Sequence, residues 1–190
     1  MDYAAEDFLC LSSFYIPSRE RTEFFSQICS HHQHLKSLHF SLFQHETINK
    51  TGYIIVNGIS IEGGAGITQT TTPFGTLFVF QDPLTVAANR SSKLVGISEG
   101  TSITSSVDGL QSISIAKLTL RLKHHKGSIS VVGAINNVKS SNLPVVGGTE
   151  DFMFVQGYVT SSPVDLKGLT VVYKIEFHLY WPPYATHHTS

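Results

Sequence analysis

From residue 37 to the carboxyl end, short segments of alternating apolar and polar residues are separated by turn residues, with no helical segment between them. In the segment 38–46, Leu38, Phe40 and Leu42 share one face, as the period of two in a β-strand requires. Turn residues follow at 108–109, 125–127 and 165–168. About eight strands joined by short turns predict an all-β fold, an eight-stranded antiparallel β-barrel. Such a barrel has room for side chains or for one small ligand.

Three further segments have strand patterns. Residues 75–82 predict a short buried strand that ends at Asp82-Pro83. The segments 93–104 and 171–180 alternate, and the residues that share one face are Val95, Ile97, Glu99, Thr101 and Ile103 in the first, and Val171, Tyr173, Ile175, Phe177 and Leu179 in the second. These segments supply the alternating faces that a barrel wall needs.

One strand changes phase. Ile113 and Ile115 have one parity, whereas Leu118, Leu120 and Leu122 have the other. A β-bulge at Ala116-Lys117 would place all five on one face, and bulges bend strands toward barrel closure. The sequence therefore predicts a bulge within residues 112–123.

The charge content excludes two classes of partner. Charged residues make up 14% of the 190 residues, against about 25% in average soluble domains. The net charge is −1 and no run of Lys or Arg occurs, whereas nucleic acids and anionic membrane surfaces are recognised by a basic face. No apolar run approaches the roughly 20 residues of a membrane span. Neither a nucleic acid nor a membrane is therefore expected as a partner.

Residues 1–36 have a different composition, with clustered charge and the sequence CSHHQH. We interpret them as an amino-terminal arm, poorly ordered or partly helical near residues 18–30, and residues 37–190 as the barrel domain. Asp2, Glu6 and Asp7 precede a short apolar stretch, which is not the pattern of a secretory signal. Cys10 and Cys29 either pair or remain free thiols, and two cysteines alone cannot build a metal site.

Glycosylation sequons begin at Asn49 and Asn89. Sequons are short and arise often by chance, so they are weak support for secretion. We expect these two asparagines to carry glycans only if the protein is secreted.

The stretch Gly147-Gly148-Thr149 could belong to a phosphate loop, a catalytic turn or a sheet corner. A phosphate loop needs a following helix amino terminus. The residues after Glu150 instead alternate, which predicts a strand with Phe152, Phe154, Gln156 and Tyr158 on one face. The glycines are therefore interpreted as a tight turn that leads into a strand, and nucleotide binding is excluded.

Other catalytic motifs are missing from the sequence. It contains no HExxH, CxxC or GxSxG, and its histidines cluster at 31–34, 124–125 and 187–188, where we interpret them as solvated surface. Neither a metal ion nor a cofactor is predicted.

Six carboxylates in the predicted barrel are candidate acids or bases: Glu46, Asp82, Glu99, Asp108, Glu150 and Asp151. Asp82 and Asp108 precede Pro and Gly, as turn residues do. Glu99 shares a face with apolar residues, so it either has a shifted pKa and a partner or lies on an outward face. Glu46 follows His45 at the end of the first strand, where it faces a cavity mouth or water.

Five segments together resemble the plant dirigent family: 74–85, 91–100, 105–110, 127–133 and 143–159. They occur in the family's order and spacing between about residues 37 and 181. The resemblance implies an eight-stranded antiparallel barrel that assembles as a homotrimer, with one pocket in each barrel. It also implies a small phenolic substrate, because members of the family guide reactive phenolic intermediates.

Residues 45–58 and 178–186 are most similar to the pterocarpan synthase branch. That branch implies loss of water from a 4-hydroxyisoflavan through a quinone methide, followed by stereoselective ring closure to a pterocarpan. Two alternatives stay open: a non-catalytic guide for coupling phenoxy radicals that a separate oxidase makes, and a barrel that only binds a phenolic. Family members are commonly secreted to the apoplast, whereas the absence of a signal pattern leaves the cytoplasm as the alternative.

Several polar and aromatic residues that lignan-forming members of the family carry are replaced in this sequence. Lignan-forming members have a His-Asp pair on the first strand, and this sequence has His45-Glu46 there, although the local spacing also allows Gln44 to align with that pair. Two aromatic residues of the lignan-forming members are replaced here by Ser102 and Thr104. A family Asp is replaced by Ile135, which is followed by Asn136. One family Arg is replaced by Asn142 or Ser141, and a second Arg is replaced by Gln156. The family cysteine near the carboxyl end is also missing, so neither Cys10 nor Cys29 has that partner. These replacements disfavour radical coupling.

The expected site follows from these positions. Glu46 is assigned the acid–base role, directly or through His45. The expected substrate-binding residues are Gln44, Ser102, Thr104, Asn136 and Asn142. Asp82 and Asp151 are family-like acids with either a structural or a site role.

Overall fold

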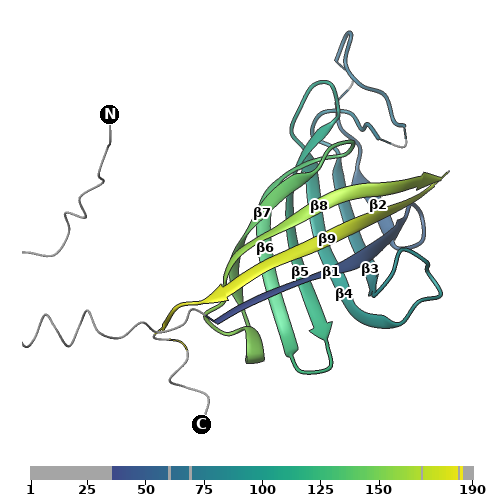
Figure 1. The fold of residues 1–190 in the computed structure, drawn as a ribbon. Coiled ribbons are helices and arrows are strands. Elements are labelled where there is room, and N and C mark those ends of the chain that lie inside the picture. The colour runs from purple at the N-terminus through teal and green to yellow at the C-terminus, as the bar shows by residue number, and fades with distance from the viewer. Residues whose placement is uncertain (1–35, 60, 69, 168, 184, 186–190) are drawn as a thin grey trace, which may run out of the picture. The chain divides into compact units, whose positions relative to one another are not determined.

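The computed structural model describes residues 36–59, 61–68, 70–167, 169–183 and 185 (Figure 1). Residues 1–35 of the predicted arm, the histidines at 31–34 and 187–188, and both cysteines lie outside these residues, whereas Lys36 begins the first strand. The described part is a β-barrel. Its elements in chain order are β1 (Lys36–Thr47), β2 (Gly52–Val56), β3 (Leu77–Thr85), β4 (Leu94–Thr104), β5 (Gln111–Arg121), β6 (Lys126–Asn136), β7 (Ser141–Gly148), the 3₁₀-helix η1 (Glu150–Phe152), β8 (Gln156–Lys167) and β9 (Thr170–Trp181).

Eight strands close the barrel in the order β1-β9-β8-β7-β6-β5-β4-β3, and β3 pairs back with β1. All of these pairings are antiparallel, and β2 lies outside the ring, paired with β3. Figure 1 shows the amino-terminal strand β1 beside the carboxyl-terminal strand β9, a pairing that runs from Lys36 opposite Trp181 to Thr47 opposite Thr170. The predicted eight-stranded antiparallel barrel is confirmed. In the described part of the chain, no helix is long and apolar enough to cross a membrane.

The predicted bulge in β5 is wrong. β5 pairs in unbroken register with both β4 and β6. Ser112, Ser114, Ala116, Leu118 and Leu120 all point inward, and Ile113 and Ile115 point outward, about half exposed. The apolar residues therefore change parity because the type of residue that faces the interior changes along the strand. Small polar side chains line one half of the strand's inner face, and leucines line the other half.

Two strand ends also differ from prediction. β3 does not stop at Asp82-Pro83 but continues to Thr85, where the pairing with β4 shifts by one residue. After Gly148 the chain forms η1 and a turn, and β8 begins only at Gln156. Phe154 has a left-handed φ of 61°, which breaks the alternation expected for a strand. Gly147 and Gly148 are the last residues of β7, so the predicted tight turn lies after them.

The barrel interior has two parts. Large apolar side chains fill the end near the β5–β6 hairpin, namely Leu120, Ile129, Phe152, Phe177, Leu179 and Trp181. At the other end, β4 and β5 present serine and threonine to the interior and leave space between the walls. A loop between β2 and β3 lies over this end, and Ala65 and Thr72 in it donate backbone hydrogen bonds to Val107 and Gly109 in the β4–β5 connection.

Candidate functional site

The space at this end is a cavity of about 500 Å³. That volume lies within the roughly 300–1,000 Å³ of small-molecule sites. Its walls come from every strand of the barrel ring and from the β2–β3 loop, which contributes Ile67, Thr68, Thr70, Thr71 and Thr72. Apolar groups from Phe78, Phe80, Ile135, Leu143, Val159 and Ile175 surround the polar ones.

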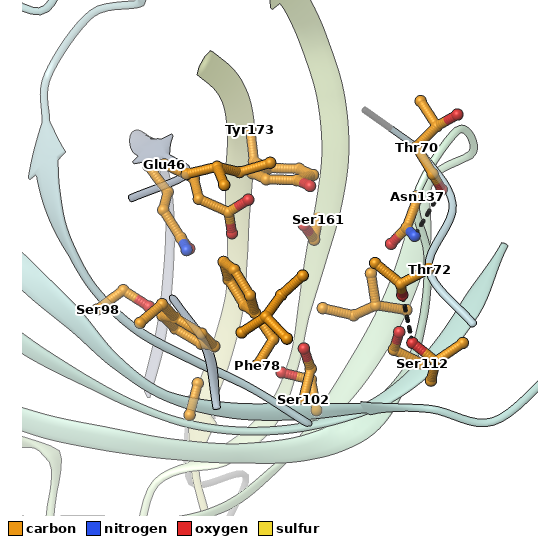
Figure 2. Close-up of a pocket in the computed structure, with 18 of the residues that line it drawn as sticks. Glu46, Thr70, Thr72, Phe78, Ser98, Ser102, Ser112, Asn137, Ser161 and Tyr173 are labelled. Carbon is orange, nitrogen blue, oxygen red and sulfur yellow. Dashed lines mark hydrogen bonds between the residues drawn. The ribbon is translucent and has the colours of Figure 1, made fainter. Parts of the chain in front are cut away.

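Four of the predicted site residues line the cavity. Gln44 and Glu46 lie on the inward face of β1, and Ser102 and Thr104 lie on the inward face of β4. Figure 2 shows Glu46 with Tyr173 on one side of the cavity, and Ser102 and Ser112 on the other. The closed ring brings these segments together although they are far apart in sequence.

Glu46 has the most perturbed carboxyl group in the cavity. Burial raises its pKa to about 8, and the neighbouring charge of Asp82 adds to the increase. A carboxyl group in this environment holds its proton at neutral pH. Glu46 can therefore donate a proton to a bound molecule, which an ordinary surface glutamate cannot do efficiently.

Asp82 lies fully buried beside the cavity. Burial raises its pKa to about 6, against the opposing effects of hydrogen bonds from Thr51 and Gln44 and of the positive charge of Arg90. Gln44 Nε2 donates to Asp82 Oδ2 over 2.7 Å, while Oδ1 has no hydrogen-bond partner among the described residues. Asp82 is therefore connected to the cavity through its hydrogen bond with Gln44 and through its effect on the pKa of Glu46.

Tyr173 on β9 lies opposite Gln44 in the sheet and lines the cavity. Burial raises the pKa of its phenol, and the charges of Glu46 and Asp82 raise it further. Tyr173 therefore stays a neutral hydroxyl group, able to donate one hydrogen bond and to accept others.

His45 lies behind the cavity wall. It is fully buried on the outward face of β1, and its Nε2 lies 2.7 Å from Thr85 Oγ1, which in turn donates to Ala87 O. Burial lowers the pKa of His45, with a further contribution from Arg90, so the imidazole is neutral and donates from Nε2. His45 is not among the cavity-lining residues. The residue through which Glu46 was predicted to act therefore lies outside the cavity and bonds Thr85.

Asn136 and Asn142 do not line the cavity either. Asn136 Oδ1 accepts the N–H groups of Val138 and Lys139 in the β6–β7 connection. Asn142 is exposed on β7, where its Oδ1 accepts the hydroxyl of Thr160. The adjacent Asn137 reaches the cavity instead, because the chain turns at the end of β6, and it donates to Thr70 O over 2.8 Å (Figure 2).

Asp151 is placed at the other end of the barrel. Its Oδ2 accepts the N–H of Lys126 over 2.8 Å at the start of β6. Glu150 lies 3.5 Å from the Lys126 ammonium. Asp151 therefore bonds the start of β6 and does not line the cavity.

The two remaining candidate acids, Glu99 and Asp108, also interact with neighbouring groups of the protein. Glu99 faces outward and pairs with Lys117, whose hydrogen bond lowers the pKa of Glu99, with Gln81 as a second donor. Asp108 accepts hydrogen bonds from the Ser106 hydroxyl and the Leu110 N–H, as predicted for a turn residue. Among the described residues, no three His, Cys, Asp or Glu side chains gather as a metal site would require.

Several residues that line the cavity are not predicted from the sequence to do so, namely Asn49, Phe78, Ser98, Ser112, Ser114, Asn137, Ser161 and Tyr173. Ser112 and Ser114 share the parity of Leu118 and Leu120, so they would have been found had β5 been treated as a regular strand. Asn49 lies at the cavity edge with a left-handed φ of 64°, and Asn89 is exposed in the β3–β4 connection. Both sequon asparagines are therefore accessible.

The comparisons with known proteins agree with this fold. The family model for dirigent-like proteins matches residues 37–180. Pterocarpan synthase 1 of Glycine max is 37% identical over 98 residues, which cover 49% of this chain and 52% of the relative. Dirigent protein 5 of Arabidopsis thaliana is 34% identical over 88 residues, which cover 46% and 48%. The chain thus spans about half the length of these curated relatives.

A solved structure extends the similarity to the whole barrel. The pterocarpan synthase dirigent protein GePTS1 superimposes with a TM-score of 0.66, covering 77% of this chain and 91% of that one, at 21% identity. At this identity the likeness establishes the fold. Since the family model also covers the barrel from 37 to 180, the chain belongs to the dirigent-like protein family.

Proposed function

We propose that this protein converts a 4-hydroxyisoflavan to a pterocarpan by removing water and closing a ring stereoselectively. The observation that carries the proposal is Glu46, a carboxylic acid with a pKa of about 8 that faces a cavity of about 500 Å³. The similarity to Pterocarpan synthase 1 of Glycine max supports the choice of substrate.

The reaction begins with loss of the 4-hydroxyl group. Glu46 donates its proton to this oxygen as the C4–O bond breaks, and the oxygen leaves as water. The substrate's own phenol para to C4 loses its proton to solvent water and supplies electrons, which gives a quinone methide. Proton donation by a well-placed acid contributes typically 10²- to 10⁴-fold to a rate.

Ring closure completes the reaction. The 2′-hydroxyl group attacks C4 and loses its proton, and the quinone methide oxygen regains one. Counting both steps, one proton returns to Glu46 and one water is lost, so neither an oxidant nor a cofactor is consumed. The main task of the cavity wall is to hold the pendant ring over one face of C4, because orientation alone can supply several kcal/mol.

The charge of the cavity fits a neutral phenolic. Among the described lining residues, none is Lys, Arg or His, and Glu46 is the lining carboxylate. A phenolic acid would bring a second negative charge beside Asp82 with no cation among the described lining residues to contact it. A neutral isoflavonoid avoids this cost.

The alternative function is a non-catalytic guide for coupling phenoxy radicals made by a separate oxidase. The relatives named dirigent proteins support it. It requires positions that hold two radicals, whereas Ser102 and Thr104 occupy the places of the lignan-type aromatic residues and make the cavity walls small and polar. We therefore favour dehydration.

The proposal includes a homotrimer. The outward faces of β3, β4 and β5 expose Val79, Ile97, Ile103, Ile113 and Ile115, each between 38% and 54% accessible. Contiguous exposed apolar side chains of this kind are typical of protein contacts. The proposal also includes secretion to the apoplast, where Asn49 and Asn89 would carry glycans.

The test is to incubate the purified full-length protein with each 4-hydroxyisoflavan stereoisomer without oxidant and to follow products by chiral chromatography. Pterocarpan formed faster than in buffer, from one preferred isomer, is expected. No acceleration from any isomer would rule out the dehydratase function. Stereoselective monolignol coupling with an added oxidase would then establish the alternative.

A further inference from the structure

Two histidines face each other on the outer surface of the barrel wall. His39 on β1 lies opposite His178 on β9, and their Nδ1 atoms are 3.4 Å apart. The next residues inward, Phe40 and Phe177, pack in the core, so both histidines lie on the outward face. We call them the histidine pair. Neither residue lines the cavity, and the proposed dehydration does not use them.

The distance between the two nitrogens suits a shared metal ion. Zinc binds histidine nitrogen at about 2.0–2.1 Å, in tetrahedral geometry. Two bonds of this length at the tetrahedral angle place their nitrogens about 3.3–3.4 Å apart. The Nδ1 atoms of the histidine pair already have this separation, so they can bind one ion without a movement of β1 relative to β9.

The facing nitrogens also determine where the protons of the pair lie. A neutral imidazole carries one proton, on Nδ1 or on Nε2, and its other nitrogen is an acceptor. Two unprotonated Nδ1 atoms at 3.4 Å would bring their lone pairs together, so one ring must donate from Nδ1 to the other. A metal ion replaces that proton and accepts both lone pairs, while the donating ring takes a proton from water on Nε2. No net proton is released.

Aromatic contacts orient the pair. The ring of Tyr158 on β8 stacks on the ring of His178, with centroids 4.6 Å apart and planes inclined by 17°. The ring of His39 meets that of His178 edge-on, with centroids 5.4 Å apart. Side chains that are already oriented lose less conformational freedom when they bind a ligand. The pair is therefore better prepared for an ion than two separate surface histidines are.

We propose that the histidine pair binds one divalent transition-metal ion of the kind that prefers imidazole, Zn²⁺ or Cu²⁺. The two Nδ1 atoms are its protein ligands, and water fills the remaining positions. Zinc centres in enzymes have three or four protein ligands, so an ion held by two exchanges readily with solvent. Cu²⁺ should bind more tightly than Zn²⁺, whereas Mg²⁺ prefers oxygen ligands and should not bind. The site does not depend on the proposed dehydration.

A bound ion links the first and last strands of the barrel. His39 and His178 are 139 residues apart in sequence, and the pairing of β1 with β9 brings them together (Figure 1). In the unfolded chain they rarely meet, so the ion binds the folded state and stabilises it. The histidines at 31–34 and 187–188 are close in sequence, so they can bind metal in the unfolded chain as well and add little stability.

The test is the melting temperature of the full-length protein in EDTA and with added Zn²⁺, Cu²⁺ or Mg²⁺. The variants are His39→Gln and His178→Gln, because glutamine stays polar at an outward position but lacks the imidazole ligand. His124→Gln is the matched control, since His124 is exposed between β5 and β6. Isothermal titration calorimetry with Zn²⁺ on the same proteins gives the dissociation constant of the site that the two pair variants lack.

Zn²⁺ at one hundred times this dissociation constant should raise the melting temperature of the natural protein and of His124→Gln by about 5–10 °C. Both pair variants should melt as the natural protein does in EDTA and should lose most of the rise with Zn²⁺. Cu²⁺ should act at lower concentration, and Mg²⁺ should have no effect. A natural protein that Zn²⁺ does not stabilise, or a rise that survives in both pair variants, would overturn the site.

Discussion

Gln44 on β1 donates from Nε2 to Oδ2 of Asp82 on β3 over 2.7 Å, two residues before Glu46 on the same face of β1. This bond fixes a carboxylate beside a carboxylic acid. The Asp82 charge helps to raise the pKa of Glu46 to about 8, and its own pKa is raised to about 6 by burial. At neutral pH the pair therefore holds close to one proton, on Glu46, where a ligand can reach it.

Glu46→Gln should stabilise the protein in alkaline solution. The pKa of Glu46 is raised on folding from 4.5 to about 8, so its contribution to stability is present at low pH and is lost as pH rises through about 8. Glutamine does not ionise, so the variant loses no stability in this way as the pH rises. The melting temperature of Glu46→Gln should exceed that of the natural protein at pH 9 by several degrees, at about 2–4 °C per kcal/mol, and should match it near pH 4.

Scanning calorimetry across pH measures this difference. The control is Glu99→Gln, because Glu99 is exposed and pairs with Lys117. That variant should not gain stability at alkaline pH. A Glu46→Gln protein that melts at or below the natural temperature at pH 9 would contradict the raised pKa.

Asp82→Asn should shift the alkaline limb of the pH–rate profile to lower pH. Since the Asp82 charge raises the pKa of Glu46, its removal lets Glu46 lose its proton at lower pH. The profile of kcat/KM reports ionisations of the free enzyme and is the quantity to measure. Asp151→Asn is the control, because Asp151 bonds the Lys126 N–H at the other end of the barrel. An unchanged alkaline limb in Asp82→Asn would show that the charge of Asp82 does not affect the ionisation of Glu46.

Ile115→Glu should prevent assembly. Ile115 is 54% exposed on the outward face of β5, within the apolar surface proposed as the subunit contact. A glutamate at this position would be buried in the trimer as an unpaired charge, which is strongly unfavourable. Light scattering during size-exclusion chromatography should give three chain masses for the natural protein and one for the variant. Val164→Glu on β8, at 49% exposure, is the control and should remain trimeric. A monomeric natural protein would refute the trimer.

Gly157→Ala should destabilise the barrel. Gly157 has a φ of +125°, and a Cβ there would lie 2.0 Å from His178 O on β9. The backbone strain alone costs about 1–3 kcal/mol, and the steric clash adds to it. Gly147→Ala is the matched control, because a Cβ at Gly147 would meet nothing within 4 Å. Urea denaturation compares the two, and equal midpoints would contradict the close approach of β8 to β9.

The barrel was predictable because strand periodicity and turn residues act locally. Leu38, Phe40 and Leu42 do point inward, and Asp108 does cap a turn. The expectation that apolar residues face the interior failed at Ile113 and Ile115, where the interior is a polar cavity and the outer face is apolar. Hydrophobicity alone does not distinguish a core from an exposed apolar face.

The site was predictable where it follows strand parity. Glu46 and Gln44 alternate inward along β1, so their place in the cavity follows from the core residues before them. Tyr173 and Asn137 were missed because their approach to Glu46 and Thr70 depends on ring closure and on a loop conformation. His45 is expected at the site because His45-Glu46 stands where the family has His-Asp, although neighbours in a strand face opposite sides.

The most direct measurement is the rate of pterocarpan formation by Glu46→Gln, with the preferred 4-hydroxyisoflavan isomer at pH 7 and Glu99→Gln as the matched control. Glutamine fills the same space but has no proton to donate to the leaving oxygen. We predict that kcat falls by about 10²- to 10⁴-fold in Glu46→Gln and is unchanged in Glu99→Gln. Turnover by Glu46→Gln at the natural rate would remove Glu46 from the mechanism.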